Sequence, residues 1–253
     1  MELPFAHKTL AELATENYKF ASVLDSFGIS FYQAPETTLS YTCDLRKLNL
    51  NQVLDKLLKA NCNTNEPSLS EIAKMSIEGL IPYLKHTHRT FIRRKLPYMA
   101  KLIADIRPEC FDQPEIAYDL KLVFPLFSED FIHHIHEEED TTFDYMMLLA
   151  NADKKKDFDI SQLYFYMRGF SLAAVSEEHA KEDDEMEGIR ELTSNYAIHE
   201  NTGVYTRVVY SELQEFELLL GTHSKIENEI LFPRGLALEN RVKLKMTARA
   251  RMN

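Results

Sequence analysis

The sequence predicts an all-α protein in which residues 68–235 form an up-down four-helix bundle behind a small helical N-terminal domain. The chain has only 7 Gly and few runs of β-branched residues, which favours helices over a sheet-rich fold. Inward-facing residues also recur at alternating spacings of four and three, the pattern of a helix that faces other helices. This spacing is clearest in Val209, Leu213, Phe216, Leu220, His223, Glu227 and Ile230.

A histidine and a glutamate occupy two consecutive inward positions of this stripe, where an ordinary bundle has leucines. Burying His223 and Glu227 without partners would cost on the order of several kcal/mol. Something in the core must therefore compensate them, and a metal ion is the simplest candidate. A metal site requires that other helices place ligands in the same register.

Composition indicates a globular protein, with 45% hydrophobic and 27% charged residues in a chain of 253. The formal net charge of -11 argues against nucleic acid or an anionic membrane surface as the main partner. The N-terminus lacks signal-peptide features, and no apolar run approaches the roughly 18 residues of a membrane span. Cys43, Cys62 and Cys110 fit neither a disulfide framework nor a zinc finger. We therefore expect a reduced cytoplasmic protein.

The N-terminal domain, residues 1–62, is expected to hold two short helices. Thr9 and Glu12 form a capping-box sequence that begins the first helix, and Gly28 is suited to end it. The second helix begins near Asn49, and a polar linker then leads to the bundle. Because two short helices make a weak core, we expect this domain to dock on the bundle or on another subunit, which would give a homodimer.

The first bundle helix is expected from Ser68 to about Ile106. His88 continues the alternating spacing of the apolar residues before it and therefore turns inward. His86, two residues earlier, lies on nearly the opposite face and is expected in solvent. Pro82 is a candidate for a kink in this helix.

The second bundle helix, from about Glu115 to Ala150, repeats the same spacing. This register separates its crowded histidines and acids, because only His134 and Glu138 share the stripe of the preceding phenylalanines. The complete stripe is Leu120, Phe124, Phe127, Phe131, His134 and Glu138.

The third and fourth helices each add another inward histidine. The aromatic segment 160–170 either begins the third helix or covers one end of the bundle, and His179 then falls on an apolar stripe. The fourth helix, which carries His223, is expected to end at Pro233. A basic tail, residues 236–253, follows it, and we interpret this tail as a surface or interface segment.

Each of the four helices therefore places one histidine inward, and two of them add a glutamate four residues later, on the same face. Four imidazoles and two carboxylates suit a dinuclear site, with two terminal histidines per metal and both carboxylates bridging. Nitrogen and oxygen ligands without thiolate fit iron or manganese better than zinc, and they leave open positions for O2, NO, peroxide or an oxo group. The predicted ligands are His88, His134, Glu138, His179, His223 and Glu227.

A single histidine on an apolar stripe is more often a hydrogen-bonded core residue than a metal ligand. One His-x-x-x-Glu pair is also unremarkable in a chain with 9 His and 40 acidic residues. Here two such pairs share one register, and both remaining helices carry an inward histidine. This repetition favours the metal site.

At these residues the chain resembles the RIC (repair of iron centres) di-iron proteins of the hemerythrin-like cation-binding group. The run from His223 to Arg234 resembles the family ending H-x-x-x-E-N-x-x-L-F-P-R, and His134 to Glu139, with Phe143 beyond, resembles H-x-x-x-E-[ED]…F. The resemblance covers nearly the whole chain. Its other parts are Thr87-His88 leading to Leu96-Pro97, Glu178-His179 followed by Gly188 and Glu191-Leu192-Thr193, and Thr9–Leu39.

The resemblance implies a cytoplasmic protein with two iron ions, bridged by oxo and carboxylate groups, that repairs iron–sulfur clusters damaged by nitrosative or oxidative stress. Its partners would be damaged iron–sulfur proteins or the gases NO and O2. It would act either through NO- or O2-reactive chemistry at the iron pair or as a donor of iron. Glu178, beside the predicted ligand His179, is a candidate relay for protons or iron.

The chain departs from the family at a Cys-Cys-Gly-Gly turn, where it has Tyr32-Gln33-Ala34-Pro35. The dithiol chemistry of relatives therefore does not carry over, and Cys43 is nearby in sequence but single. This departure favours an alternative, which is hemerythrin-like binding or sensing of O2 or NO without repair activity. A further alternative is a regulatory module, in which the N-terminal domain binds a partner and the metal reports the redox state.

Overall fold

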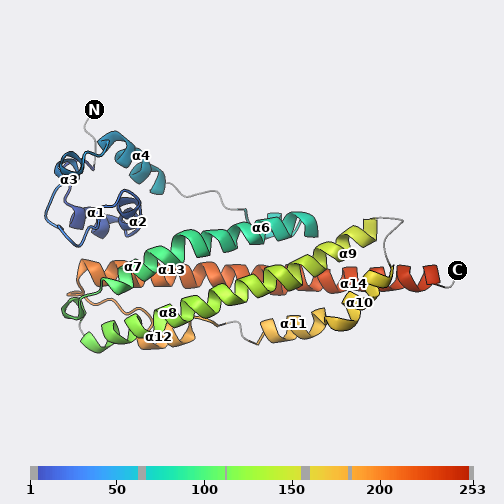
Figure 1. Ribbon diagram of the computed structural model, residues 1–253. Helices are drawn as coiled ribbons and strands as arrows, with labels where there is room; N and C mark the ends of the chain where they lie inside the picture. Colours follow the sequence, from blue (N-terminus) through green and yellow to red (C-terminus); the bar gives the residue numbers. More distant parts are fainter. Residues whose placement is uncertain (1–4, 62–66, 112, 155–159, 182–183, 251–253) are drawn as a thin grey trace. The chain divides into compact units, whose positions relative to one another are not determined.

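The protein is all-α, as the sequence predicts. The computed structural model describes residues 5–61, 67–111, 113–154, 160–181 and 184–250, and these residues form helices without any strand (Figure 1). Among these helices, none combines the length and hydrophobicity that a membrane span requires. In chain order the helical segments are α1 (Leu10–Glu16), α2 (Lys19–Ser26), α3 (Leu39–Arg46), α4 (Leu50–Ala60), α5 (Leu69–Ile72), α6 (Ile77–Thr90), η1 (Phe91–Lys95), α7 (Leu96–Ala104), η2 (Pro108–Cys110), α8 (Pro114–Glu137), η3 (Glu138–Phe143), α9 (Asp144–Lys154), α10 (Ile160–Gly169), α11 (Leu172–His179), α12 (Glu187–Leu192), α13 (Val204–Ile226), η4 (Glu227–Leu231) and α14 (Phe232–Ala250).

The chain divides into two compact units. Unit 1 consists of Met1–Glu66, Lys95–Pro125 and Met186–Glu217. Unit 2 consists of Pro67–Arg94, Leu126–Glu185 and Leu218–Asn253. This division groups the segments of the chain differently from the predicted domains. The predicted domain boundaries stay a prediction, as does the homodimer.

The N-terminal part of unit 1 contains four short helices, where the sequence predicts two. The predicted capping box is present, because the Thr9 hydroxyl accepts from the Glu12 amide at 3.1 Å and the Glu12 carboxylate accepts from the Thr9 amide at 2.7 Å. The predicted first helix breaks at Asn17, whose side-chain oxygen accepts a hydrogen bond from the Lys19 amide at 3.0 Å. Thr38 caps the additional helix α3 in the same way. Local side-chain hydrogen bonds thus divide this segment into shorter helices.

Unit 1 also buries a carboxyl group that is not among the predicted ligands. Glu212 of α13 is 1% exposed, and its Oε2 lies 3.4 Å from Nζ of Lys95. Lys95 also pairs with the half-buried Glu215. Burial raises the pKa of Glu212 to about 7, although the charge of Lys95 works in the opposite direction. Glu212 therefore keeps its proton in the folded protein at mildly acidic pH.

The parent protein is expected to lose stability as the pH rises from about 5 to about 8. Replacing Glu212 with glutamine is expected to remove this loss. The folded protein holds the Glu212 proton up to a pH of about 7, whereas the unfolded chain releases it near the ordinary pKa of 4.5. The stabilisation is thus complete below the unfolded pKa and disappears as the pH rises through the folded pKa, by about 3 kcal/mol in total. Urea unfolding of both metal-free proteins at the two pH values measures the difference.

The exposed Glu109 of unit 1 supplies a control for this titration. Glu109→Gln is expected to follow the pH dependence of the parent protein. An equal pH dependence for Glu212→Gln and the parent protein would mean that Glu212 is ionised throughout this range.

Unit 2 is a helical bundle, as the sequence predicts. Helix α9 packs against both α6 and α14, and α14 also packs against α11. The packed faces share one apolar core, to which Leu84, Phe143, Leu149, Phe232 and Val242 contribute. The four predicted bundle helices therefore all contribute to the unit that contains the predicted ligands.

The fourth bundle helix does not end at Pro233, as predicted, but continues as α14 to Ala250. The π-helical segment η4 ends at Leu231, two residues before Pro233, and the Phe232 amide donates a hydrogen bond to the Glu227 carbonyl, five residues back. In such a widened turn a proline, which lacks an N–H group, interrupts the helix less than in a regular α-helix. Pro97 follows the π-helical η1 in the same way and is also accommodated. The described part of the predicted basic tail is therefore helical, and it buries Leu238, Val242 and Met246.

Candidate metal centre

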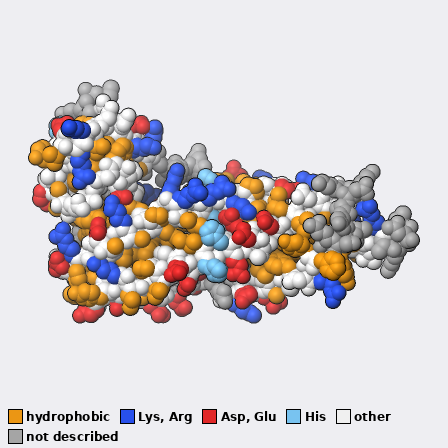
Figure 2. Space-filling view, viewed as in Figure 1, with side chains coloured by type: hydrophobic (Ala, Val, Ile, Leu, Met, Phe, Trp, Pro, Cys, Tyr) orange, Lys and Arg blue, Asp and Glu red, His pale blue; other side chains and the backbone are white. Residues whose placement is uncertain are grey.

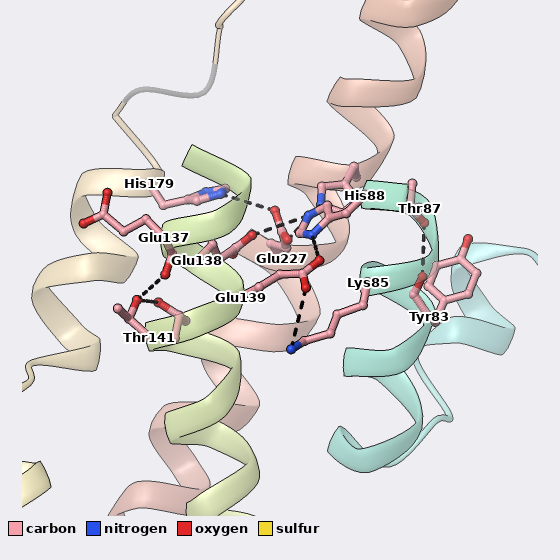
Figure 3. Close-up of polar contacts among 12 residues, drawn as sticks. Tyr83, Lys85, Thr87, His88, Glu137, Glu138, Glu139, Thr141, His179 and Glu227 are labelled. Atoms are coloured by element: carbon pink, nitrogen blue, oxygen red, sulfur yellow. Dashed lines mark hydrogen bonds and ion pairs between the residues drawn. The ribbon is translucent and has the colours of Figure 1, made fainter. Parts of the chain in front are cut away.

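The structure brings the predicted ligands together in unit 2. Four of them are buried, with ligand atoms that all lie within 4.8 Å of one another: His88, Glu138, His223 and Glu227. His179 extends this group, because its Nε2 lies 3.2 Å from Oε2 of Glu227 (Figure 3). The His134 ring lies beside the His179 ring, with 5.8 Å between their centroids. Two pairs of histidines, His88 with His223 and His134 with His179, therefore accompany the two glutamates.

Glu227 faces both pairs of histidines. Its Oε1 lies 2.9 Å from Nε2 of His223, which is four residues earlier on the same helix. Its Oε2 lies 3.2 Å from Nε2 of His179 on α11. A carboxylate with each oxygen directed at a different imidazole is arranged as a bridging ligand requires.

The closest approach in the site joins two imidazole nitrogens. Nε2 of His88 and Nε2 of His223 are 2.8 Å apart, and Oε2 of Glu138 lies 3.6 Å from the same His88 nitrogen. His88 hydrogen-bonds through Nδ1 to the Glu139 carboxylate, so in the neutral ring Nε2 carries the lone pair. Nε2 of His223 therefore either donates a proton to this lone pair or presents a second lone pair, and two facing lone pairs require a cation between them.

A π-helical segment accompanies the ligands on three of the bundle helices. Segment η1 begins three residues after His88, η3 begins at Glu138 and η4 begins at Glu227. Single π-turns inside α-helices occur frequently at functional sites. Each widened turn shifts the register of the residues after it by one position, which a regular three-and-four spacing does not anticipate.

The structure adds two residues that hold the imidazoles from behind. Oε1 of Glu139 lies 2.9 Å from Nδ1 of His88, and Oδ1 of Asn228 lies 3.1 Å from Nδ1 of His179. Lys85 pairs in turn with Glu139 at 3.7 Å (Figure 3). Such partners fix the ring orientation and the tautomer of a metal-binding histidine. Sequence reasoning missed both residues, although each directly follows a predicted glutamate ligand.

Aromatic side chains enclose the site. Phe143 stacks on His88 with ring centroids 5.6 Å apart and planes within 4°. Phe91 meets the edge of His223 at 5.6 Å, and Phe232 lies 5.2 Å from His179. These contacts restrict rotation of the imidazoles and exclude water, so the electrostatic interactions inside the site are strong.

The two glutamates have opposite pKa shifts. Burial, followed by the charge of Glu227, raises the pKa of Glu138 well above its ordinary value. Burial also works to raise the pKa of Glu227, but the imidazoles of His223 and His179 outweigh it and hold that pKa below its ordinary value. Burial and the neighbouring His223 lower the pKa of His88 to about 4. Without a metal the site thus favours the protonated form of Glu138 more than an exposed carboxyl group would, and His88 is neutral at neutral pH.

These atoms fit a metal ion. Oε1 of Glu138 is buried and makes no hydrogen bond within the described residues. Oε1 of Glu227 approaches His223 to 2.9 Å but makes no hydrogen bond of good geometry there either. Buried carboxylate oxygens without hydrogen bonds are costly, and a coordinated cation would compensate them. Nitrogen and oxygen donors of this kind suit a first-row transition metal.

The remaining candidates lie outside the buried group. His86 is exposed, as its position on the opposite face of α6 predicts, and His133 and His136 are exposed on α8. Glu178 is also exposed, and its role as a relay stays a prediction.

No protein-family profile matches the chain. It is similar to the iron-sulfur cluster repair protein YtfE of Musicola paradisiaca, 22% identical over 232 residues, which are 92% of this chain and 97% of that protein. It is 23% identical to the iron-sulfur cluster repair protein ScdA of Staphylococcus epidermidis over 88% of this chain and 95% of the relative. YtfE of Pectobacterium atrosepticum is 23% identical over 92% and 99% of the two chains. The resemblance to the repair-of-iron-centres family, which the motifs of this chain predict, is therefore confirmed along nearly its whole length.

Proposed function

We propose that this protein holds two iron ions at the predicted centre and repairs iron–sulfur clusters damaged by nitrosative or oxidative stress in the cytoplasm. The observation that carries the proposal is the buried meeting of two histidines and two glutamates, with two imidazole nitrogens 2.8 Å apart. The relatives named as iron-sulfur cluster repair proteins support the repair activity.

The donor set supports iron. Imidazole and carboxylate groups without thiolate suit iron or manganese more than zinc. Glu138 and Glu227 would bridge the two ions, as paired carboxylates do in other helical bundles. When bound, the iron pair would supply redox chemistry and open positions for NO or O2. The terminal ligands would be His88, His134, His179 and His223.

The residues of this chain prepare the site for a cation. A pKa of about 4 keeps His88 neutral at physiological pH, so that its Nε2 is available as a ligand. Glu138, whose pKa is raised by burial, would release its proton when a cation binds. Metal uptake should therefore release protons and weaken in acid. The exposed Glu178, next to His179, would relay protons or iron between the centre and a damaged iron–sulfur protein.

The alternative function is binding or sensing of NO or O2 without repair. Its support is the Tyr32-Gln33-Ala34-Pro35 turn, which stands where the family has its cysteine pair. Cys43 is a poor replacement, because it is fully buried and burial raises the pKa of its thiol.

The experiment that separates these functions begins with metal analysis and an absorption spectrum of protein purified without oxygen. The loaded protein is then incubated with a [4Fe–4S] dehydratase inactivated by NO, and recovery of the dehydratase activity is measured. Repair predicts recovery with the loaded protein and none with the metal-free protein. A reversible NO adduct without any recovery would support the alternative.

A further inference from the structure

We infer that the two metal positions hold their ions unequally, that the position of His134 and His179 releases its metal first, and that Glu139 and Asn228 set this difference. The inference rests on the proposed two-metal centre and deepens it by naming the ion that is available for donation. It concerns the retention of metal and can be tested without any repair assay.

The chain supports the two positions differently. His88 lies near the end of the fourteen-residue α6, which continues without a break into η1 and α7, and its side chain is 2% exposed. His179 is the last residue of the eight-residue α11, and its side chain is 11% exposed. His134 is half-buried, whereas His223 is buried. A ligand at the end of a short helix is displaced with less disruption than one inside a long, packed helix.

The residues behind the imidazoles also differ in charge. His88 donates from Nδ1 to the carboxylate of Glu139, and a charge-assisted hydrogen bond of this kind makes the other ring nitrogen a stronger donor to a metal. Lys85 holds this carboxylate in place and also pairs with Asp144 at 3.6 Å. His179 donates instead to the amide oxygen of Asn228, a neutral and weaker acceptor. Both histidines donate a hydrogen bond from Nδ1, but the charged partner of His88 makes it a stronger metal ligand than His179.

The two partners occupy equivalent places in the sequence. Glu139 directly follows Glu138, and Asn228 directly follows Glu227. Each predicted glutamate ligand is thus followed by a residue that orients a histidine from another helix. The chain has a charged group at one of these places and a neutral group at the other.

Loss of one metal leaves the other position intact. Glu227 directs separate oxygens at His223 and His179, so it keeps one set of contacts when the ion next to His179 departs. Histidine side chains reach the surface in Figure 2, with acidic side chains beside them. The histidines of unit 2 that are exposed or half-buried are His86, His133, His134, His136 and His179.

The test measures iron release from the loaded protein with a colorimetric Fe(II) chelator under anaerobic conditions. We expect two phases, each releasing one iron per chain. Asn228→Asp should slow the fast phase, and Glu139→Gln should accelerate the slow phase, each by roughly 10- to 100-fold, the usual effect of partners behind metal ligands. Glu137→Gln is the matched control, because this exposed residue contacts Thr141 through its backbone carbonyl and should leave both phases unchanged.

A second pair of variants assigns the phases. His179→Ala should load one iron that leaves in the slow phase, whereas His88→Ala should retain no slowly released iron. Asn228→Ala, which removes the amide without adding charge, should accelerate the fast phase and replaces Asn228→Asp if that variant does not fold.

Several outcomes would overturn the inference. Release of both irons in a single phase would do so, as would a fast phase that neither Asn228 variant alters. Unequal release from a protein that restores no damaged cluster would leave the inference standing and reject the repair function. Repair of damaged clusters by a protein that releases both irons in a single phase would reject the inference and leave the repair function standing.

Discussion

Glu227→Ala is expected to leave the protein unable to hold two metal ions, with the metal content falling to one ion per chain or less. The carboxylate directs one oxygen at His223, at 2.9 Å, and the other at His179, at 3.2 Å, so its removal takes a ligand from both positions. The loss of affinity should exceed the roughly 10- to 100-fold that removal of a partner behind a ligand costs. Elemental analysis after incubation with excess Fe(II) and desalting measures the effect.

Two further variants separate coordination from folding. Glu229→Ala removes an exposed carboxylate two residues away, whose partner Lys225 lies at 3.8 Å, and should keep the full metal content. Glu227→Gln keeps the shape of the side chain but loses its charge, and we expect it to fold as the parent protein does while losing metal. If Glu227→Ala still bound two ions almost stoichiometrically, Glu227 would not be a ligand.

His88→Ala is expected to abolish loading of two metals, whereas His86→Ala should leave the metal content unchanged. His88 is buried, with Nε2 2.8 Å from the facing nitrogen of His223 and its ring stacked on Phe143. His86 is exposed on the same helix, only two residues earlier. The two variants therefore remove the same chemical group from opposite faces of α6, and metal analysis of both is the measurement.

A control variant tests whether His88→Ala loses metal because a ligand is gone or because the removed side chain leaves a cavity that disturbs the fold. His88→Gln fills most of the space and can still reach Glu139, so a loss of metal with an unchanged circular dichroism spectrum would identify coordination as the cause. Loss of metal in His86→Ala, with full retention in His88→Ala, would show that the register assigned to the first bundle helix is wrong.

Much of the candidate site follows from spacing in the sequence. The three-and-four register selected His134 and Glu138 from a crowded run of histidines and acids, and it assigned His88 rather than His86 to the interior. The structure buries His88 and Glu138, leaves His134 half-buried, and exposes His86, His133 and His136. Periodicity succeeds here because a helix surrounded by other helices has only one face for buried groups.

Local chemistry was predictable only in part. The Thr9 capping box could be identified because both of its partners lie within one helical turn. The break at Asn17 and the passage of the fourth helix through Pro233 were not anticipated. Residue propensities describe an average helix, whereas the π-turn before Pro233 is stabilised by the surrounding bundle, which buries its Glu227 and Leu231.

By itself the sequence determined the helical class, the inward face of each bundle helix and the kinds of side chain at the predicted centre, because these depend on periodicity and residue chemistry along one chain. Only the tertiary structure decided which groups meet. It directed the two oxygens of Glu227 at different histidines and placed Glu139 behind His88 and Asn228 behind His179. These contacts join residues from different helices, and their distances depend on how the helices pack, which no spacing within a single helix records.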